Sequence, residues 1–346
     1  MKPINRSNPF LTSLLLALFL LCGCNLPGSA AITPAPAPAA QSAVVSPTIP
    51  PTAAPTATDR PARVILVTPP DTNPQTAQQV QKALTTLAAP AGITLDTVQA
   101  LQPAEVTPDV KMVFYTSIPP NLPQVVAAAP ATQFAAVSPV DITPVPNFSV
   151  IRLQPERRTF IAGLVTILSA NDWRSVGLLP VQDPSAPALE DSFRNGGQYF
   201  CGICNAYFAP AARFPLVRHT DSANFQVAVN DAVKTIVYSI YVAPEISTPE
   251  MLKSLADQKF TLVGGVTPAD DIRPRWAATV REDVSAPMRG LWPDMLAGKG
   301  GKVVSSAVVV EDTNPALFSS GKKDMVQIAV DQINKNQLNP LTPPMQ

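Results

Sequence analysis

Residues 64–74 read VILVTPPDTNP, an apolar and β-branched run followed by a polar, proline-rich segment. Such a run, ended by turn-forming residues, is typical of a buried strand and the loop after it. From residue 75 the apolar positions take helical spacing, at Ala77, Val80, Ala83, Leu84 and Leu87. We therefore expect a strand, a loop and a helix, which is the repeating unit of a parallel α/β sheet.

The same kind of unit recurs over the following residues. Apolar or alternating runs at 93–98, 110–115, 133–137 and 149–153 predict four more strands, and 122–129 predicts a helix. Strands that alternate with helical segments favour a mainly parallel sheet with helices on both faces. We assign this first lobe to residues 63–150.

A strongly apolar helix at 155–170 restarts the pattern, and Gly163 within it marks a point of close helix packing. Further strands are expected at 176–180, 214–217, 235–239 and 261–263, with helices at 188–199, 224–233 and 250–257. These elements define a second lobe at 151–278. The sequence thus predicts an α/β fold with two doubly wound parallel-sheet lobes joined by a hinge.

Residues 279–346 are expected to return across the hinge and to end in a helix. Residues 277–281 read as the segment that crosses back, followed by a helix at 286–296. One strand at 303–310 and a closing helix at 320–334 complete the chain.

The N-terminus begins with basic residues and continues with an apolar run at 10–21. A membrane-spanning helix needs roughly 20 residues, so this run is too short to span and reads as the core of a secretory signal. Leu21, Cys22 and Gly23 before Cys24 resemble the lipobox of bacterial lipoproteins. The resemblance implies a signal peptide at 1–23 and lipidation of Cys24, which would anchor the chain to the extracytoplasmic side of the cell membrane. An ordinary signal peptide that contains cysteines is the alternative.

Residues 24–62 are dominated by Pro, Ala, Thr and Ser and show no apolar periodicity. Such a composition buries too little surface to offset the entropy of ordering. We interpret the segment as a semi-rigid membrane tether, of which ~35 residues in polyproline form would reach roughly 100 Å. A proline-rich arm packed on the folded part is the alternative.

Composition and motifs exclude several classes of function. The chain has 25 Lys and Arg against 25 Asp and Glu, whereas a nucleic-acid partner favours a basic surface. It has no Gly-X-Ser-X-Gly or His-Glu-X-X-His motif and no phosphate-binding glycine loop, and its one histidine is His219. We therefore predict that the protein is not an enzyme and needs no cofactor or metal.

Cys201 and Cys204 are the two cysteines outside the signal region. In an exported protein such a pair favours a local disulfide. A redox pair is the alternative, but reactive cysteines often lie at a helix N-terminus, and this pair follows the end of a predicted helix. Zinc would need more ligands than these two cysteines and His219 supply.

Several segments of the folded part resemble the basic membrane protein (BMP) family of substrate-binding lipoproteins. They are residues 158–168, 176–179, 191–199 and 317–333, in that family's order and spacing. The resemblance implies a periplasmic-binding-protein fold of type 1. It also implies capture of a purine nucleoside for an ABC importer, because the family's characterised members do this.

Two loops depart from the family pattern. The loop at 70–77 keeps one carboxylate, Asp71, and lacks the aromatic residue of the family signature. In the loop at 265–271, Thr267 and Ala269 stand where the family has the carboxylates that pair with ribose hydroxyls. Asp270 or Asp271 would substitute only if the loop were shifted. Losing such partners changes specificity strongly, so these loops predict a ligand preference that differs from the family's.

Ligands of open α/β sheets bind beyond the carboxyl ends of the strands, and in a two-lobed binder the facing loops form a cleft. This rule nominates polar residues after the predicted strands and one aromatic residue, Trp276, for stacking on a ligand. The candidates are Asp71, Asn73, Tyr115, Thr116, Ser117, Gln182, Asp183, Asp270, Asp271, Arg273 and Trp276. Trp173 and Trp292 are expected to be packing residues.

The sequence therefore favours a tethered, two-lobed protein that captures a small polar solute for an ABC transporter permease by hinge closure. The alternative is a surface sensor or scaffold lipoprotein with a degenerate cleft. A cleft lined by paired polar groups would favour solute binding, and one filled by apolar side chains would favour the scaffold.

Overall fold

The computed structural model describes residues 60–70, 72–205 and 207–343 of the 346-residue chain. All of these lie in one compact unit, Thr58–Gln346. The predicted signal peptide, almost all of the predicted tether, Cys24 and Asp71 lie outside the described residues.

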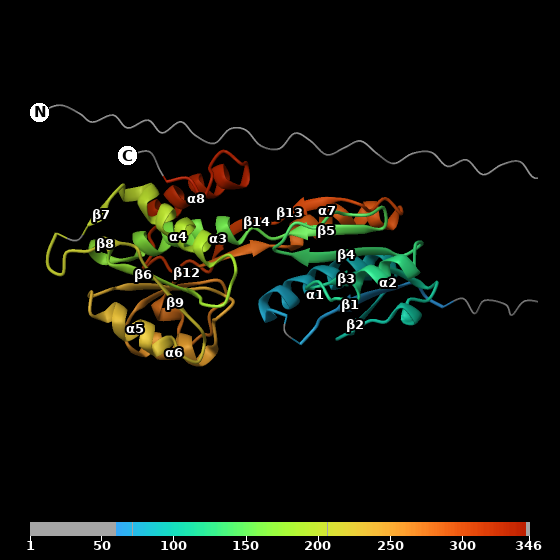
Figure 1. Cartoon of the computed structure of the whole chain (residues 1–346), viewed down its shortest axis with the longest axis horizontal. Coiled ribbons are helices and arrows are strands. Elements are labelled where there is room, and N and C mark those ends of the chain that lie inside the picture. The colour runs from blue at the N-terminus through green and yellow to red at the C-terminus, as the bar shows by residue number, and fades with distance from the viewer. Residues whose placement is uncertain (1–59, 71, 206, 344–346) are drawn as a thin grey trace, which may run out of the picture. The chain divides into compact units, whose positions relative to one another are not determined.

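The first lobe is a six-stranded parallel sheet with the strand order β13-β5-β4-β3-β1-β2 (Figure 1). Its strands are β1 (Arg63–Val67), β2 (Thr94–Val98), β3 (Val110–Tyr115), β4 (Gln133–Ser138), β5 (Phe148–Arg152) and β13 (Val303–Ser305). Its helices are α1 (Pro74–Ala88), α2 (Leu122–Ala128) and α7 (Ser285–Leu296), with short 3-10 turns at Ala89–Ala91 and Pro103–Glu105.

Strand β1 shows why this sheet has helices on both faces. Val64 and Leu66 pack with α1 and α7, whereas Ile65 and Val67 pack with α2. Successive side chains of a strand point to opposite faces, so a continuous apolar run is buried on both sides. Helices on both faces of the sheet therefore explain why residues 64–67 form a continuous apolar run.

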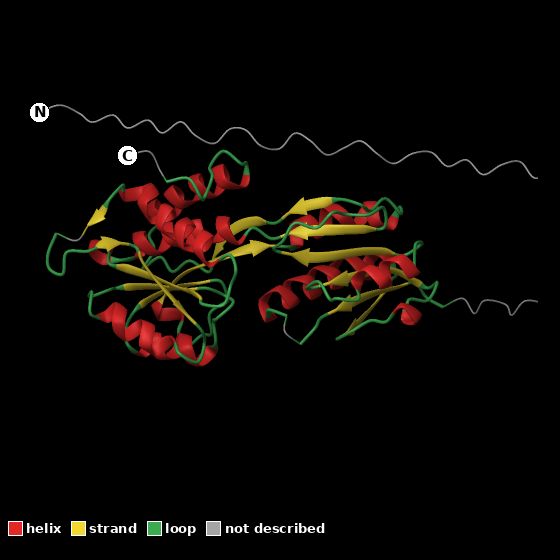
Figure 2. Ribbon diagram, viewed as in Figure 1, coloured by secondary structure: helices red, strands yellow, loops and turns green. Residues whose placement is uncertain are grey.

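The second lobe repeats this strand order in the sheet β14-β12-β11-β10-β6-β9. The strands are β6 (Ser175–Pro180), β9 (Leu216–Thr220), β10 (Ser239–Val242), β11 (Thr261–Gly264), β12 (Trp276–Asp283) and β14 (Ala307–Glu311). All pairs are parallel except β12 with β14. Helices α3 (Pro155–Ser169), α4 (Ala186–Cys201) and α8 (Ser320–Asn334) cover one face, and α5 (Phe225–Val233) and α6 (Pro249–Asp257) cover the other (Figures 1 and 2).

Smaller elements complete this lobe. A two-stranded antiparallel pair, β7 (Cys204–Asn205) and β8 (Arg213–Phe214), follows α4, and 3-10 turns lie at Asn171–Trp173 and Arg273–Arg275. The structure joins Cys201 to Cys204 in a disulfide with a Cα–Cα distance of 5.4 Å. Cys201 is the last residue of α4, and Gly202 caps the helix.

Helices α3 and α4 pack closely through two glycines. A Cβ atom at Gly163 would overlap the backbone carbonyl of Phe193, and one at Gly196 would overlap the carbonyl of Phe160. Each helix thus presents a glycine to the backbone of the other. The expectation that Gly163 is a close-packing point is confirmed.

The chain crosses between the two sheets three times, between β5 and α3, between β12 and α7, and between β13 and β14. The single strand expected at 303–310 is wrong for this reason. Val303–Ser305 pairs with β5 in the first sheet, Ala307–Glu311 pairs with β12 in the second, and Ser306 lies between them. Residues 277–281 also do not cross, because β12 stays in the second sheet as far as Asp283.

The predicted division at residue 278 differs from the structure. Of the residues expected to form one return segment, α7 and β13 pack in the first lobe, whereas β14 and α8 pack in the second. Trp292 of α7 is a packing residue whose ring lies 6.3 Å from that of Phe114, centroid to centroid. The predicted α/β class with two parallel-dominated sheets is confirmed.

Candidate functional site

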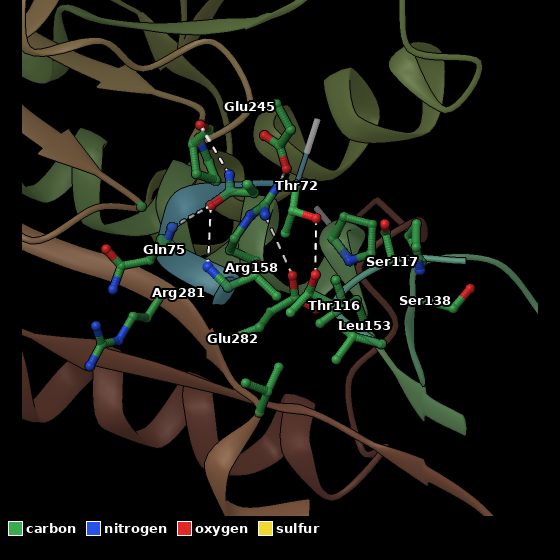
Figure 3. Close-up of a pocket in the computed structure, with 18 of the residues that line it drawn as sticks. Thr72, Gln75, Thr116, Ser117, Ser138, Leu153, Arg158, Glu245, Arg281 and Glu282 are labelled. Carbon is green, nitrogen blue, oxygen red and sulfur yellow. Dashed lines mark hydrogen bonds and ion pairs between the residues drawn. The ribbon is translucent and has the colours of Figure 1, made fainter. Parts of the chain in front are cut away.

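A pocket of about 520 Å³ lies where the strands of both sheets end (Figure 3). The first lobe lines it with loops after β1, β3 and β4, and the second lobe lines it with loops after β6, β10 and β11. In each sheet the strand order reverses beside β1 or β6. Parallel α/β sheets bind ligands at this switch point, because the loops on either side of it run to opposite faces and leave a crevice.

The wall from the first lobe carries hydroxyl and amide groups. They belong to Thr72, Asn73, Gln75, Thr76, Gln79, Thr116, Ser117 and Ser138. The hydroxyls of Thr72 and Thr116 lie 2.9 Å apart (Figure 3). Thr116 Oγ1 also donates to the carbonyl of Val67 at 3.2 Å. These hydroxyls are therefore held in place by the end of β1.

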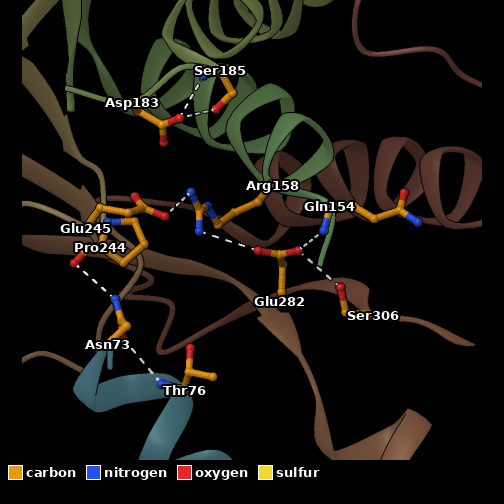
Figure 4. Close-up of polar contacts among 10 residues, drawn as sticks. All are labelled: Asn73, Thr76, Gln154, Arg158, Asp183, Ser185, Pro244, Glu245, Glu282 and Ser306. Atoms are coloured by element: carbon orange, nitrogen blue, oxygen red, sulfur yellow. Dashed lines mark hydrogen bonds and ion pairs between the residues drawn. The ribbon is translucent and has the colours of Figure 1, made fainter. Parts of the chain in front are cut away.

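Asn73 has two roles in the structure. Its Oδ1 accepts hydrogen bonds from the backbone N–H groups of Gln75 at 2.9 Å and Thr76 at 3.3 Å, so it caps α1. Its Nδ2 donates to the carbonyl of Pro244, in the loop after β10, at 3.3 Å (Figure 4). A single side chain thus fixes the start of α1 and links the two walls of the pocket.

The wall from the second lobe is charged. Arg158 of α3 donates from Nη2 to Glu245 at 2.7 Å and from Nη1 to Glu282 at 3.4 Å (Figure 4). The side chains of Arg158 and Glu282 are 7% and 5% exposed, whereas that of Glu245 is 36% exposed toward the pocket. One guanidinium therefore serves a buried carboxylate and one that a ligand can reach.

Burial and charge act together on this cluster. Burial acts to lower the pKa of Arg158, but the carboxylates of Glu245 and Glu282 act in the opposite direction and outweigh it. The pKa therefore lies above its ordinary value, and the guanidinium stays charged. Burial raises the pKa of Glu282, which shares that single guanidinium with Glu245. The hydroxyl of Tyr241 lies buried beside the cluster, and burial raises its pKa as well.

Glu282 also connects the segments where the chain crosses between the sheets. Its carboxylate accepts from the backbone N–H of Gln154 and, at 3.1 Å, from the hydroxyl of Ser306 (Figure 4). Gln154 precedes α3, Ser306 separates β13 from β14, and Glu282 lies near the end of β12. One carboxylate therefore holds all three crossings together at the edge of the pocket.

Asp183 lies on the wall of the second lobe. Its Oδ1 accepts from the backbone N–H of Ser185 at 2.8 Å and from the hydroxyl of Ser185 at 2.6 Å. Gln182 does not line the main pocket. It lines an adjoining pocket of about 450 Å³ that shares Asp183 and Glu245 with the first.

Two of the predicted ligand residues are core residues instead. Tyr115 is buried on the α2 side of the first sheet, where burial raises the pKa of its hydroxyl. Trp276 is fully buried in the second lobe, packs against Gly264, and donates from Nε1 to Thr279 Oγ1 at 3.0 Å. Neither side chain lines the pocket, because each begins or ends a strand that is covered by helices.

The loop after β11 also differs from the expectation. Asp270 is fully exposed and pairs with Arg273 at 3.4 Å, and neither residue lines the pocket. Asp271 lines another pocket, of about 490 Å³, together with Asn73 and Lys253. Of the described candidates, Asn73, Thr116, Ser117 and Asp183 come together in the main pocket.

Sequence reasoning missed the charged cluster. Glu245 follows β10 by three residues and obeys the strand-end rule, but the strand is expected at 235–239 and lies at Ser239–Val242. Arg158 is hidden in a helix that reads as apolar, and Glu282 in a segment expected to cross between lobes. A strand placed by the apolar run at residues 239–243 would have found Glu245.

The fold is similar to those of known binding and regulatory proteins. An ABC transporter solute-binding protein from Conexibacter woesei matches with a TM-score of 0.62 at 16% identity, covering 81% of this chain and 98% of that one. A solute-binding protein of an ABC transporter system from Aeropyrum pernix matches with a TM-score of 0.59 at 10% identity, covering 83% and 94%. A transcriptional activator of the comK gene from Bacillus halodurans matches with a TM-score of 0.62 at 11% identity, covering 81% and 99%.

At these identities the similarity establishes the fold, of the type 1 periplasmic-binding-protein kind. No protein-family model and no curated protein matches the sequence. Among the described residues, no helix is both long enough and apolar enough to span a membrane.

Proposed function

We propose that the protein is an extracytoplasmic solute-binding protein that holds a small polar ligand in the pocket between its two sheets and presents it to an ABC importer. The observation that carries the proposal is the pocket itself. It lies at the switch points of two sheets of the same strand order, and loops from both lobes contribute hydrogen-bonding groups. A ligand bound there would contact both lobes and would favour their closure.

The lining supports a ligand-binding role over a scaffold role. A degenerate cleft would be filled by apolar side chains of its own lobes, whereas this pocket leaves about 520 Å³ and exposes hydroxyl, amide and charged groups. The solute-binding neighbours support the proposal through their fold alone. Lipidation at Cys24 and the tether at 24–62 belong to the same proposal and would keep the binding part near a membrane permease.

The BMP resemblance and its nucleoside ligand receive less support from the lining. A nucleobase is a flat aromatic group that often stacks on an aromatic side chain. None of the described residues that line the pocket is Phe, Tyr or Trp, because Tyr115 and Trp276 are buried in the cores. We therefore propose a polar solute other than a nucleoside.

A thermal-shift screen of the protein against sugars, amino acids, amines, nucleosides and bases tests the proposal. A ligand at about 100 times its Kd stabilises the folded state by roughly 2.7 kcal/mol, which raises the melting temperature measurably. Ser117→Trp would fill the pocket and should abolish the shift, whereas Thr85→Trp, on an exposed position of α1, should leave it. A folded protein that responds to no solute would favour the sensor or scaffold alternative.

A further inference from the structure

The charges around the pocket are divided unequally between its walls. All ionisable side chains among the described lining residues come from α3, β12 and the loops of the second lobe. They are Glu156, Arg158, Asp183, Glu245, Arg281 and Glu282. The wall from the first lobe contributes hydroxyls, amides and apolar side chains such as Ile118, Val137 and Val140, but no ionisable group. Any charge on a ligand would therefore be balanced by the second lobe alone.

The two guanidiniums already have carboxylate partners. Arg158 is shared between Glu245 and Glu282, and Arg281 pairs with Glu311, which lies outside the pocket lining. Neither cation is left to balance a further negative charge. A further negative charge on a ligand would therefore find no guanidinium among the described lining residues that lacks a carboxylate partner.

The wall from the second lobe also carries carboxylates that are not fully bonded within the protein. The side chain of Glu156 has no hydrogen-bond or ion-pair partner in the described part of the chain, and the carboxylate of Asp183 is bonded only by Ser185, through one of its two oxygens. Glu245 is bonded through Oε1 alone. The side chains of Glu156 and Asp183 thus face the pocket without a cation of their own, and Glu245, which pairs with Arg158, keeps one oxygen without a hydrogen bond.

The adjoining pocket extends this negative surface. It shares Asp183 and Glu245 with the main pocket and adds Asp221, and no Lys or Arg is among its lining residues. Clefts lined by one sign of charge concentrate ligands of the opposite sign. The field at the mouth of the site therefore favours a cation.

An independent feature indicates a second ligand group. Arg158 is buried to more than nine-tenths and lines the pocket, and its Nε has no hydrogen-bond partner among the described residues. An arginine N–H group can only donate. An acceptor oxygen on a ligand, close to the ion pairs of Arg158, would satisfy a donor that the protein leaves unpaired.

We propose that the pocket selects a small, non-aromatic solute that carries a positively charged amine and acceptor oxygens, such as an amino sugar or an amino alcohol. This inference rests on the proposed function. The ammonium group lies toward Glu156, Asp183 and Glu245, where its three donors meet carboxylate oxygens. The hydroxyls lie toward Thr72, Gln75 and Thr116, which can both donate and accept hydrogen bonds.

Two sets of solutes, matched in shape and different in charge, test the inference on the full chain. The first set is glucosamine, glucose and glucuronate, and the second is 4-amino-1-butanol, 1,4-butanediol and 4-hydroxybutanoate. Binding is measured by isothermal titration at low and at high salt. The cationic member of at least one set should bind more tightly than its neutral and anionic counterparts, and salt should weaken it because its partners are partly exposed charges.

Charge-removing variants locate the effect. Asp183→Asn and Glu156→Gln should each weaken the binding of the cationic solute by roughly two- to fivefold, the effect of one partly exposed charge pair. Each variant should weaken the binding of a neutral solute less than it weakens that of the cationic solute. Asp324→Asn, at an exposed position of α8, is the matched control and should have no effect.

The outcomes separate this inference from the proposed function. A neutral or anionic solute that binds best, and that Ser117→Trp excludes, would overturn the charge inference and would leave solute binding supported. If neither cationic solute binds, the inference is overturned, whatever the neutral and anionic solutes do. No response to any solute here and in the screen would contradict the proposed function as well.

Discussion

The guanidinium of Arg158 lies 3.4 Å from the carboxylate of Glu282, and both side chains are almost wholly buried. The pair joins α3 of the second lobe to the end of β12, next to the point where the chain leaves for the first lobe. Because Glu282 also accepts from Gln154 and Ser306, the pair supports all three crossings. A ligand that contacts Glu245 would act on the same guanidinium, so the site and the hinge share one residue.

Removal of the guanidinium should be strongly destabilising. Arg158→Met would leave Glu282 buried without its cation, and breaking a buried ion pair by removing one partner costs about 3–5 kcal/mol. Urea unfolding followed by circular dichroism measures the free energy of unfolding. Arg213→Met, at an exposed position of β8, should change it by no more than about 0.5 kcal/mol. A similar small change for both variants would show that the pair does not support the fold.

The glycines between α3 and α4 should not tolerate alanine. Gly163→Ala would force the two helices apart, which costs about 1–3 kcal/mol, even though Ala favours a helix by about 1 kcal/mol over Gly. Gly290→Ala is the control, because this glycine of α7 has open space around its Cβ direction. Thermal unfolding should show changes of opposite sign in the free energy of unfolding. Gly163→Ala should lower it, and Gly290→Ala should raise it by about 0.5–1 kcal/mol. Stabilisation by both substitutions would refute the close approach.

Acid stability should depend on Asp109. The hydroxyl of Thr107, at 2.5 Å, and the guanidinium of Arg63, at 2.6 Å, hold the pKa of Asp109 at about 2, below its ordinary value of 3.8. A lowered pKa means that the contribution to stability is fully present above pH 3.8 and is lost as the pH falls toward 2.

Asp109→Asn tests this assignment. The variant should be less stable than the wild type at pH 7, and the difference between the two proteins should shrink as the pH falls from about 4 to about 2. Unfolding by urea at several pH values measures both curves. A difference that stays constant over this range would contradict the assigned ionisation of Asp109.

Trp276 should matter for stability and not for binding. Truncating a buried Trp to Ala costs about 3–5 kcal/mol, and Trp276→Phe should cost less, roughly 1–3 kcal/mol, because a smaller cavity and one lost hydrogen bond result. The ligand affinity of the folded variant should stay within about twofold of the wild type, since a shift below 0.5 kcal/mol is expected away from the site. A large loss of affinity without loss of stability would restore the stacking role expected from the sequence.

The fold was largely predictable because its signals are local. The apolar run at 64–67 and the helical spacing after residue 75 each identify their element from the pattern of buried positions within the segment itself. The helix predicted at 155–170 differs from α3 by one residue. The crossings were less predictable. Whether residues 303–310 form one strand or two depends on which strands they pair with, and neither β5 nor β12 can be identified as a partner from the residues of that segment.

The site was predictable only in part. Asn73, Thr116, Ser117 and Asp183 follow strands that were placed well, so the strand-end rule brings them to the pocket. Tyr115 is also at the end of its strand, as the rule requires, but its side chain lies on the face of the sheet that α2 covers. Arg158 and Glu282 come from a helix and from the end of a strand that leads to a crossing, and only the three-dimensional arrangement brings them together.

Central to the proposed function is that one solute binds both lobes at the facing strand ends. Hydrogen exchange followed by mass spectrometry, with and without a ligand from the screen, tests it most directly, because bound segments open less often. We predict slower exchange at 72–79 and 116–118 in the first lobe together with 183–185 and 244–245 in the second. Protection confined to one lobe, or placed away from these loops, would contradict the claim.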